Sequence, residues 1–191
     1  MATFPKMWPG VGSMLQDFNL LLSTSRGNEG NARSEIWYLL KEVGDEDPKA
    51  DFTGISGLLT AKTGLEPKEA VRRLRGILVD RPWEFKYILK IKPIELVVKT
   101  DLDEMIRAID GLKGSIGNGE KFKIAVEKRR SPLGSREIID ALASRIDRKV
   151  DLENPDWIVL VEVIGTITGL SILRPDEILS VEKEKREMYK R

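Results

Sequence analysis

The sequence predicts an α+β protein built from two successive domains. Segments with helical spacing of apolar residues alternate with β-branched or alternating segments along the 191 residues. Lys92 and Pro93 form the plausible junction, because proline interrupts both periodicities there. We therefore predict a first domain at residues 1–93, a second at 94–180 and a charged tail at 181–191.

The first domain has the expected order β-α-β-(β)-α-β. In chain order, its elements are a strand at 19–24, a helix at 32–43, one or two strands within 52–63, a helix that opens at Glu66 and Pro67, and a strand at 83–91. Gly44 supplies the stop of the first helix, and Pro67 suits the first position of the second. This order is typical of a ferredoxin-like sandwich, in which both helices cover one face of an antiparallel sheet.

The second domain is also mixed. Its expected elements are an extended segment at 94–100, a helix from Asp101, a glycine-rich loop at 111–119, a strand at 121–127, a helix at 136–149 and strands at 157–164 and 166–173. Phe122, Ile124 and Val126 alternate with polar residues, as in a half-buried strand. We expect Ser135 to cap the helix that follows. Eight of the last twelve residues are charged, which suggests a frayed helix or a disordered tail.

The composition excludes several kinds of chemistry. The chain has no cysteine and no histidine, so it offers no disulfide, no thiolate zinc site and no histidine base. Asp45 to Asp47 lack the spacing of a calcium loop, and the glycines at 114–119 lack the ending of a phosphate loop. We expect no catalytic residue, no metal and no cofactor. The longest apolar run has five residues, so we also expect a cytoplasmic protein without membrane contact.

Charge is sorted along the chain although the net charge is only +1. Residues 66–92 and 120–149 each carry a net +4, whereas residues 27–51 carry a net −4. Within the second basic zone, three cations end a strand and a fourth begins a helix, where free backbone N–H groups favour an anion. Arginine adds bidentate donors that suit phosphate. A cluster of three cations is by itself more typical of a solvated face.

The surrounding residues carry a family resemblance. The segments KFKIAVEKR, SREIIDALASRI, KVDLENPDWIVLVEVIG and TGLSIL, in this order within residues 121–173, resemble a THUMP domain. The helix at 101–112 and the stretch NLLLSTSRGNEGNARSEI fit the same family. THUMP domains are RNA-binding modules of tRNA-modifying enzymes, commonly preceded by a ferredoxin-like domain. The resemblance therefore implies an α/β THUMP domain that binds the acceptor stem and 3′ end of tRNA.

The resemblance also implies candidate RNA-binding residues. Those that match the RNA-facing turn and helix start are Lys128, Arg129, Arg130, Ser135 and Arg136. From the first basic zone we add Arg72, Arg73, Arg75, Lys86, Lys90 and Lys92. Gly165, Gly169 and Ser171 match family positions that we interpret as structural. Trp83 and Trp157 lie in strand patterns and are expected in the core.

Most relatives continue into a catalytic module, whereas this chain ends eighteen residues after Leu173. It therefore resembles the stand-alone branch, similar to the THUMP-domain partner of the tRNA cytidine acetyltransferase that forms 4-acetylcytidine. We expect a non-catalytic adaptor whose partners are tRNA and that enzyme, with no DNA partner. Two alternatives stay open. One is a protein-interaction or ribosome-associated module without tRNA binding. The other is a self-contained RNA enzyme that uses carboxylates and a metal.

Overall fold

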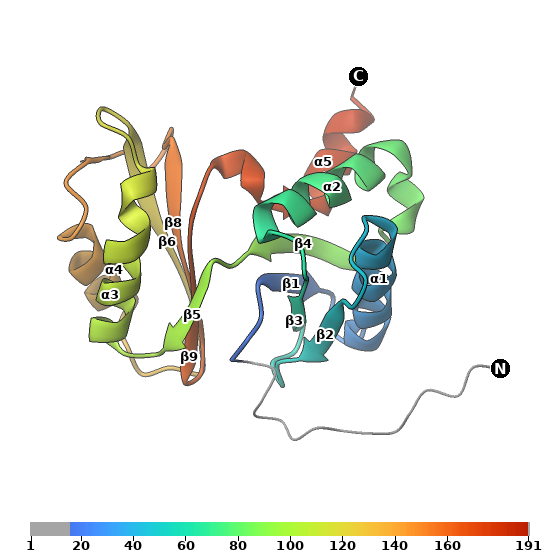
Figure 1. Cartoon of the computed structure of the whole chain (residues 1–191), viewed down its shortest axis with the longest axis horizontal. Helices are drawn as coiled ribbons and strands as arrows, with labels where there is room; N and C mark the ends of the chain where they lie inside the picture. Colours follow the sequence, from blue (N-terminus) through green and yellow to red (C-terminus); the bar gives the residue numbers. More distant parts are fainter. Residues whose placement is uncertain (1–15, 191) are drawn as a thin grey trace.

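The computed structural model describes residues 16–190, so the start of the predicted first domain, residues 1–15, lies outside it. The first sheet has the strand order β10-β4-β1-β3-β2, and every neighbouring pair is antiparallel. Its elements are β1 (Leu20–Thr24), α1 (Glu29–Glu42), β2 (Lys49–Phe52), β3 (Leu58–Lys62), α2 (Pro67–Asp80), the 3-10 turn η1 (Pro82–Glu84) and β4 (Ile88–Pro93). Both helices pack on one face of this sheet, which confirms the predicted ferredoxin-like arrangement (Figure 1).

The second sheet has the strand order β5-β9-β8-β6-β7. Its elements are β5 (Leu96–Lys99), α3 (Leu102–Leu112), β6 (Lys121–Arg129), α4 (Ser135–Ala143), β7 (Lys149–Val150), β8 (Trp157–Ile164) and β9 (Ile167–Leu173). Strand β6 runs parallel to β7 and β8, whereas β9 is antiparallel to both of its neighbours. Helices α3 and α4 cover one face and enclose a second apolar core. This mixed α/β domain follows the first after only two linking residues, Ile94 and Glu95.

A third apolar core joins the two sheets through the faces that carry no helix. Leu21 and Leu58 of the first sheet lie in one cluster with Ile158 and Leu160 of β8. In Figure 1 the helices of each domain accordingly lie on the outer sides of the molecule, with the sheets between them. Burial of apolar side chains on both sheets favours one fixed orientation of the domains.

The chain returns to the first domain at its end. After β9 and the 3-10 turn η3 (Pro175–Glu177), β10 (Leu179–Ser180) pairs with β4, and α5 (Val181–Met188) packs beside α2. Val181 is buried in the first core, and Arg75 on α2 is paired with Glu184 at 2.9 Å. The structure thus corrects the expectation of a frayed or disordered tail. The high charge of this segment suggested disorder, but the buried side chain of Val181 anchors the start of helix α5.

Several local expectations also differ from the structure. Trp83 lies in η1 and is 62% exposed, because β4 begins only at Ile88. The Glu35 carboxylate accepts the backbone N–H groups of residues 86–88 and so holds this segment as a turn. Ser135 is the first residue of α4 and makes no capping hydrogen bond; the cap position is Gly134. Trp157 is buried as predicted.

The positions that we interpreted as structural behave as such. Gly165 forms the β8–β9 turn with a φ of +61°, which favours glycine. A Cβ atom on Gly169 would lie 3.1 Å from the Ile94 side chain, so glycine permits close packing there. The Ser171 hydroxyl donates to the backbone oxygen of Pro93 and accepts the N–H of Glu95. None of the helices within residues 16–190 is both long and apolar enough to cross a membrane.

Candidate nucleic-acid interface

The three consecutive cations at the end of β6 do not form one cluster. Alternate residues of a strand point to opposite faces of its sheet. Val126 packs in the helix-covered core and Ala125 in the core between the sheets, so Lys128 and Arg129 lie on opposite faces. The Lys128 ammonium group donates to the backbone oxygen of Leu133 at 2.9 Å. Only Arg129 of this pair therefore faces the domain boundary.

Arg129 belongs to an ion network between the domains. The network consists of Lys92 from β4, Glu127 and Arg129 from β6, and Glu162 from β8. The Glu162 side chain is fully buried and pairs with Lys92 and, at 2.8 Å, with Arg129. Glu127 pairs with Lys92 at 2.9 Å and with Arg129 at 2.6 Å. Two predicted RNA-binding cations are therefore balanced by two carboxylates, in what we call the interdomain ion network.

The electrostatics of Glu127 reflect the same network. Its partial burial would raise the pKa of the carboxyl, but the hydrogen bond from Lys92 and the charges of Lys92, Arg129 and Lys90 outweigh that effect and lower it. The carboxylate therefore stays ionised near neutral pH. The network connects the two sheets beside their shared apolar core.

Two further cations lie at this boundary without a carboxylate partner. Lys90 on β4 lines a small cavity of about 60 Å³ between the sheets, together with Ser23, Glu127 and Arg129, and makes no ion pair within residues 16–190. Arg130 follows β6 with a φ of +54°, in the left-handed region. Its guanidinium group donates to the backbone oxygen of Gly54, in the β2–β3 turn, at 2.9 Å. Lys90 and Arg130 thus bring positive charge to the boundary from both domains.

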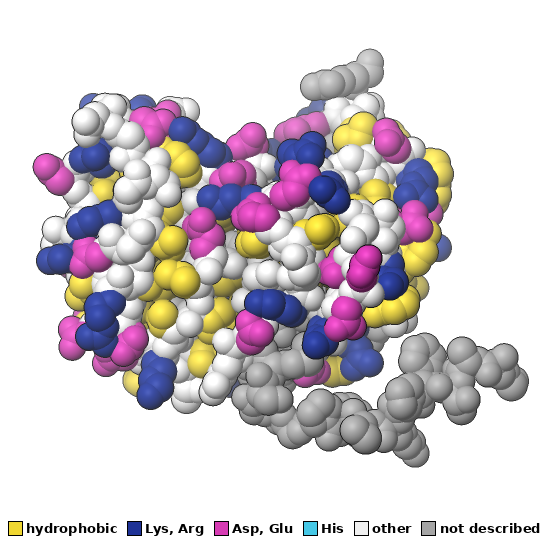
Figure 2. Space-filling view, in the orientation of Figure 1, with side chains coloured by type: hydrophobic (Ala, Val, Ile, Leu, Met, Phe, Trp, Pro, Cys, Tyr) yellow, Lys and Arg dark blue, Asp and Glu magenta, His cyan; other side chains and the backbone are white. Residues whose placement is uncertain are grey.

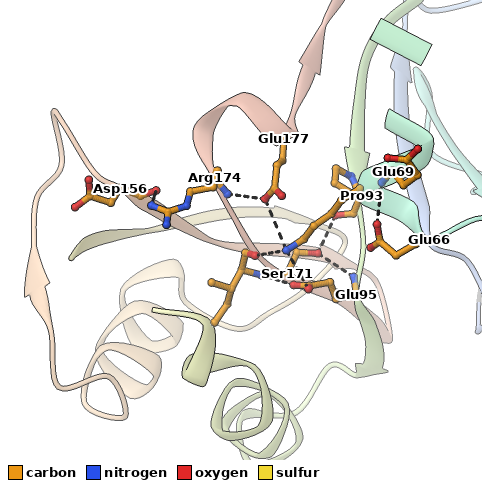
Figure 3. Close-up of polar contacts among 10 residues, drawn as sticks. Glu66, Glu69, Pro93, Glu95, Asp156, Ser171, Arg174 and Glu177 are labelled. Carbon is orange, nitrogen blue, oxygen red and sulfur yellow. Dashed lines mark hydrogen bonds and ion pairs between the residues drawn. The ribbon is translucent and has the colours of Figure 1, made fainter. Parts of the chain in front are cut away.

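The arginines of α2 lie among carboxylates. Glu69 accepts from Arg72 at 2.6 Å and from Arg73 at 2.7 Å, and these hydrogen bonds lower the pKa of Glu69 to about 2. Lys68 pairs with Glu95 of the linker at 3.2 Å and donates to the backbone oxygen of Ile172 on β9, in the second sheet. Figure 3 shows the carboxylates Glu66, Glu69, Glu95 and Glu177 around this contact.

The shallow depression beside α2 has a volume of about 500 Å³. Four cations line it, namely Lys68, Arg72, Arg75 and Arg174. Five carboxylates line it as well, namely Glu66, Glu69, Glu95, Asp176 and Glu177. Figure 2 shows both signs of charge intermixed over α2. The basic zone that the sequence shows at 66–92 is therefore largely neutralised in space.

The two remaining predicted cations are exposed, whereas Ser135 is half-buried. Arg136 is 88% exposed and pairs with Asp140 one helical turn away at 3.1 Å. Lys86 is exposed and makes no ion pair within the described chain. Among the ten predicted cations, Lys86, Lys90, Lys128 and Arg130 have no carboxylate partner within residues 16–190. Exposed ion pairs are weak, at about 0–1 kcal/mol, so an ion pair does not prevent the other six cations from binding RNA. The full set of RNA-binding residues stays a prediction.

Glu162 is the buried centre of the interdomain ion network, and it was not among the residues that we singled out from the sequence. A signal was present, because Glu162 is the single charged residue in the otherwise apolar strand WIVLVEVI. A buried carboxylate needs a cationic partner, and the structure supplies two of them. Within residues 16–190 no group of three or more potential carboxylate ligands lies close enough together to hold a metal ion.

The second sheet has a known counterpart. Residues 99–173, from the last residue of β5 to the last residue of β9, match the family model of the THUMP domain. Residues 99–173 are a THUMP domain. This match confirms the resemblance seen in the sequence and supports an RNA-binding role related to tRNA.

The matches to curated relatives cover more of this chain than the THUMP domain. THUMP domain-containing protein 1 of Bos taurus is 27% identical over 168 residues, which cover 78% of this chain and 47% of that protein. An uncharacterized protein of Methanocaldococcus jannaschii is 32% identical over 118 residues, which cover 54% of this chain and 33% of that protein. The chain thus spans between a third and a half of the length of these two relatives.

Solved structures share the two-domain arrangement. A Pyrococcus horikoshii protein, PH1313, aligns with a TM-score of 0.53 at 20% identity, over 82% of this chain and 55% of that one. TrmN from Thermus thermophilus aligns with a TM-score of 0.52 at 15% identity, over 82% and 46%. At these identities the likeness shows the fold. It includes the ferredoxin-like domain, because the THUMP domain alone is much shorter than the aligned part.

Proposed function

We propose that this chain binds tRNA with both of its domains and presents it to a separate tRNA-modifying enzyme. The observation that carries the proposal is the pair of unbalanced cations at the domain boundary, Lys90 from the ferredoxin-like domain and Arg130 from the THUMP domain. Both lie next to the network that connects the sheets. Phosphate binding needs such positive charge, and it dominates the affinity of nucleic-acid binding.

The fixed orientation of the domains supports binding to a helical stem. A-form RNA is recognised through its shape and through phosphate and 2′-hydroxyl contacts. Charges held at a constant spacing on two joined sheets can meet phosphates of one stem without first ordering the domains, which lowers the entropic cost of binding. The resemblance to THUMP proteins indicates the acceptor stem and 3′ end as the bound region.

The adaptor role follows from the residues that the chain offers. It has no histidine and no cysteine to act as base, nucleophile or metal ligand. The interdomain carboxylates Glu127 and Glu162 are each paired with two cations and therefore lack the freedom of a general base. We therefore assign catalysis to a separate enzyme, and the resemblance to the THUMP-domain partner of the tRNA cytidine acetyltransferase indicates that acetyltransferase.

The proposal is tested by reconstituting acetylation. The acetyltransferase from the same organism is incubated with tRNA, ATP and acetyl-coenzyme A, with and without this chain, and 4-acetylcytidine is quantified by mass spectrometry of digested RNA. We expect the modification rate to rise with the chain present and not with an equal amount of serum albumin. Tight binding of tRNA without any effect on acetylation would leave tRNA binding in place and contradict this choice of enzyme.

A further inference from the structure

Glu127 places a negative charge within a surface that is otherwise suited to phosphate. It lines the cavity of about 60 Å³ between the sheets, together with three cations, Lys90, Lys92 and Arg129. The Glu127 side chain is 49% exposed, whereas Glu162, which pairs with two of the same cations, is fully buried. A carboxylate that reaches solvent repels an approaching phosphate. The effect of Glu127 on RNA binding therefore depends on whether it keeps its contacts with these cations.

Glu162 and Glu127 bind different nitrogen atoms of the Arg129 guanidinium group. The Nη1 atom donates to Glu162 at 2.8 Å, and the Nη2 atom donates to Glu127 at 2.6 Å. Because Glu162 is buried, it holds the guanidinium group in place from one side. Arginine carries five N–H donors in a rigid planar fork. Release of Glu127 alone would therefore free an oriented donor edge of Arg129 without loosening the side chain.

Glu127 has a second partner that allows it to release Arg129. The Lys92 ammonium group donates to the other oxygen of the Glu127 carboxylate at 2.9 Å. A carboxylate that moves away from Arg129 thus stays paired and ionised. Ion pairs that reach solvent contribute little to stability. Exchange of Glu127 for another anion on Arg129 therefore costs little.

The charges at the cavity favour such an anion. The five charged groups there, namely Lys90, Lys92, Arg129, Glu127 and the buried Glu162, carry a net charge of +1. Lys90 has no carboxylate partner within residues 16–190, but its charge contributes to the lowered pKa of Glu127, so the two side chains lie near each other. A phosphate drawn to Lys90 therefore arrives beside the edge of Arg129 that Glu127 occupies.

We propose that Glu127 is an internal competitor of tRNA, which occupies the phosphate-binding edge of Arg129 until a tRNA phosphate replaces it there. This inference rests on the proposed function and describes how that same site is regulated. Glu127 lies two residues from Arg129 on one strand, so its effective concentration at the guanidinium group is high. A free anion competes poorly with it. A phosphate of a tRNA that is already held by Lys90 and Arg130 has a comparable advantage.

The test measures the affinity for labelled tRNA by fluorescence anisotropy at one fixed salt concentration. Glu127→Gln keeps the size of the side chain and removes its charge, so it should bind tRNA about fivefold more tightly than the parent. The matched control is Glu104→Gln. Glu104 is 40% exposed and pairs with Arg107 on α3, which covers the outer face of the second sheet. This control also frees one arginine, and its affinity should stay within about twofold of the parent.

A double-mutant cycle distinguishes competition at Arg129 from a general effect of charge. If Glu127 acts through Arg129, the gain from Glu127→Gln should disappear in an Arg129→Gln background, where no guanidinium group is left to release. Arg129→Lys is measured in parallel, because it keeps a positive charge beside the buried Glu162 if Arg129→Gln impairs folding. The gain should be smaller in this background as well, since a single ammonium group lacks the second donor edge.

Melting temperatures close to the parent show which variants are folded at the temperature of the binding assay. The inference is overturned if the parent binds tRNA and Glu127→Gln binds it no more tightly. It is also overturned if Glu104→Gln gains as much affinity, or if the full gain persists in both Arg129 backgrounds. Failure of the proposed function has a different signature, namely a parent protein that binds no tRNA, and that result would overturn the inference with it.

Discussion

Lys92, on β4 of the ferredoxin-like domain, donates to the fully buried carboxylate of Glu162, on the central strand of the THUMP domain. Arg129 binds the other oxygen of that carboxylate, and Glu127 balances the second positive charge. An isolated charge in this position would be costly, whereas the four groups together are neutral and hydrogen-bonded. The pairing therefore ties the relative orientation of the domains to the positions of the candidate RNA-binding cations.

Glu162→Gln should lower the free energy of unfolding by about 3 kcal/mol, because it leaves Lys92 and Arg129 with one carboxylate between them in a buried setting. Urea denaturation followed by circular dichroism measures the change. Lys92→Met combined with Glu162→Met should recover most of the loss, since an apolar pair needs no ionic partner. Glu137→Gln, at an exposed position, is the control. Equal stability of Glu162→Gln and the parent would show that the network does not join the domains.

Acid should destabilise the fold in a defined range. Glu120 accepts hydrogen bonds from the Trp157 indole, the Gly117 backbone and Arg174, which lower its pKa from 4.5 to about 2. A carboxyl with a depressed folded-state pKa contributes stability that is complete above its unfolded pKa and is lost as pH falls toward the folded value. The contribution of Glu120 should thus be full above about pH 5 and decline towards pH 2.

Urea midpoints of the parent and of Glu120→Gln between pH 2.5 and pH 7 measure this contribution. The parent should be the more stable protein at pH 7, and the difference should shrink as the pH falls. A difference that stays constant across this range would mean that the protonation of Glu120 is not linked to folding.

Much of the fold follows from local sequence patterns. Asp101 precedes α3 and its side chain accepts the N–H of Glu104, and Glu66 serves α2 in the same way through Glu69. The β8–β9 hairpin was also predictable, because two β-branched runs flank Gly165. These features depend on neighbouring residues and therefore appear in the sequence.

The candidate site depends on contacts between residues that are distant in sequence, and it was therefore harder to predict from the sequence. Lys128 and Arg129 are adjacent in sequence, yet strand geometry sends them to opposite faces. The partner of Arg75, Glu184, lies 109 residues further along the chain, so charge counting within 66–92 could not include it. Trp83 was misplaced for a similar reason, since Glu35 of α1 determines where the turn ends.

Removal of residues 181–191 should destabilise the ferredoxin-like domain. The truncation deletes Val181 from the first core and breaks the Arg75–Glu184 pair, at a cost of about 2 kcal/mol. Differential scanning calorimetry should show a lower melting temperature, whereas removal of residues 189–191 alone should leave it unchanged. A truncated protein as stable as the parent would show that α5 contributes no net packing.

Binding of tRNA should weaken steeply with salt. If the four cations without carboxylate partners each neutralise one phosphate, log affinity should fall with log salt concentration with a slope of about −3. Fluorescence anisotropy of labelled tRNA between 50 and 300 mM KCl provides the slope. A flat response would argue for an apolar partner surface and against RNA.

The most direct test of two-domain tRNA binding is the affinity of Lys90→Gln/Arg130→Gln, measured by anisotropy at one fixed salt concentration. Each cation is taken as a charged hydrogen bond to phosphate, so the double variant should bind tRNA about 100-fold more weakly than the parent, with each single variant intermediate. Arg186→Gln/Lys190→Gln removes the same charge from exposed positions in and just after α5, beside α2 on the helical side of the first domain, and should bind within about threefold of the parent. Parent-like affinity of the boundary variant, or equal losses in both double variants, would contradict a tRNA site between the two domains.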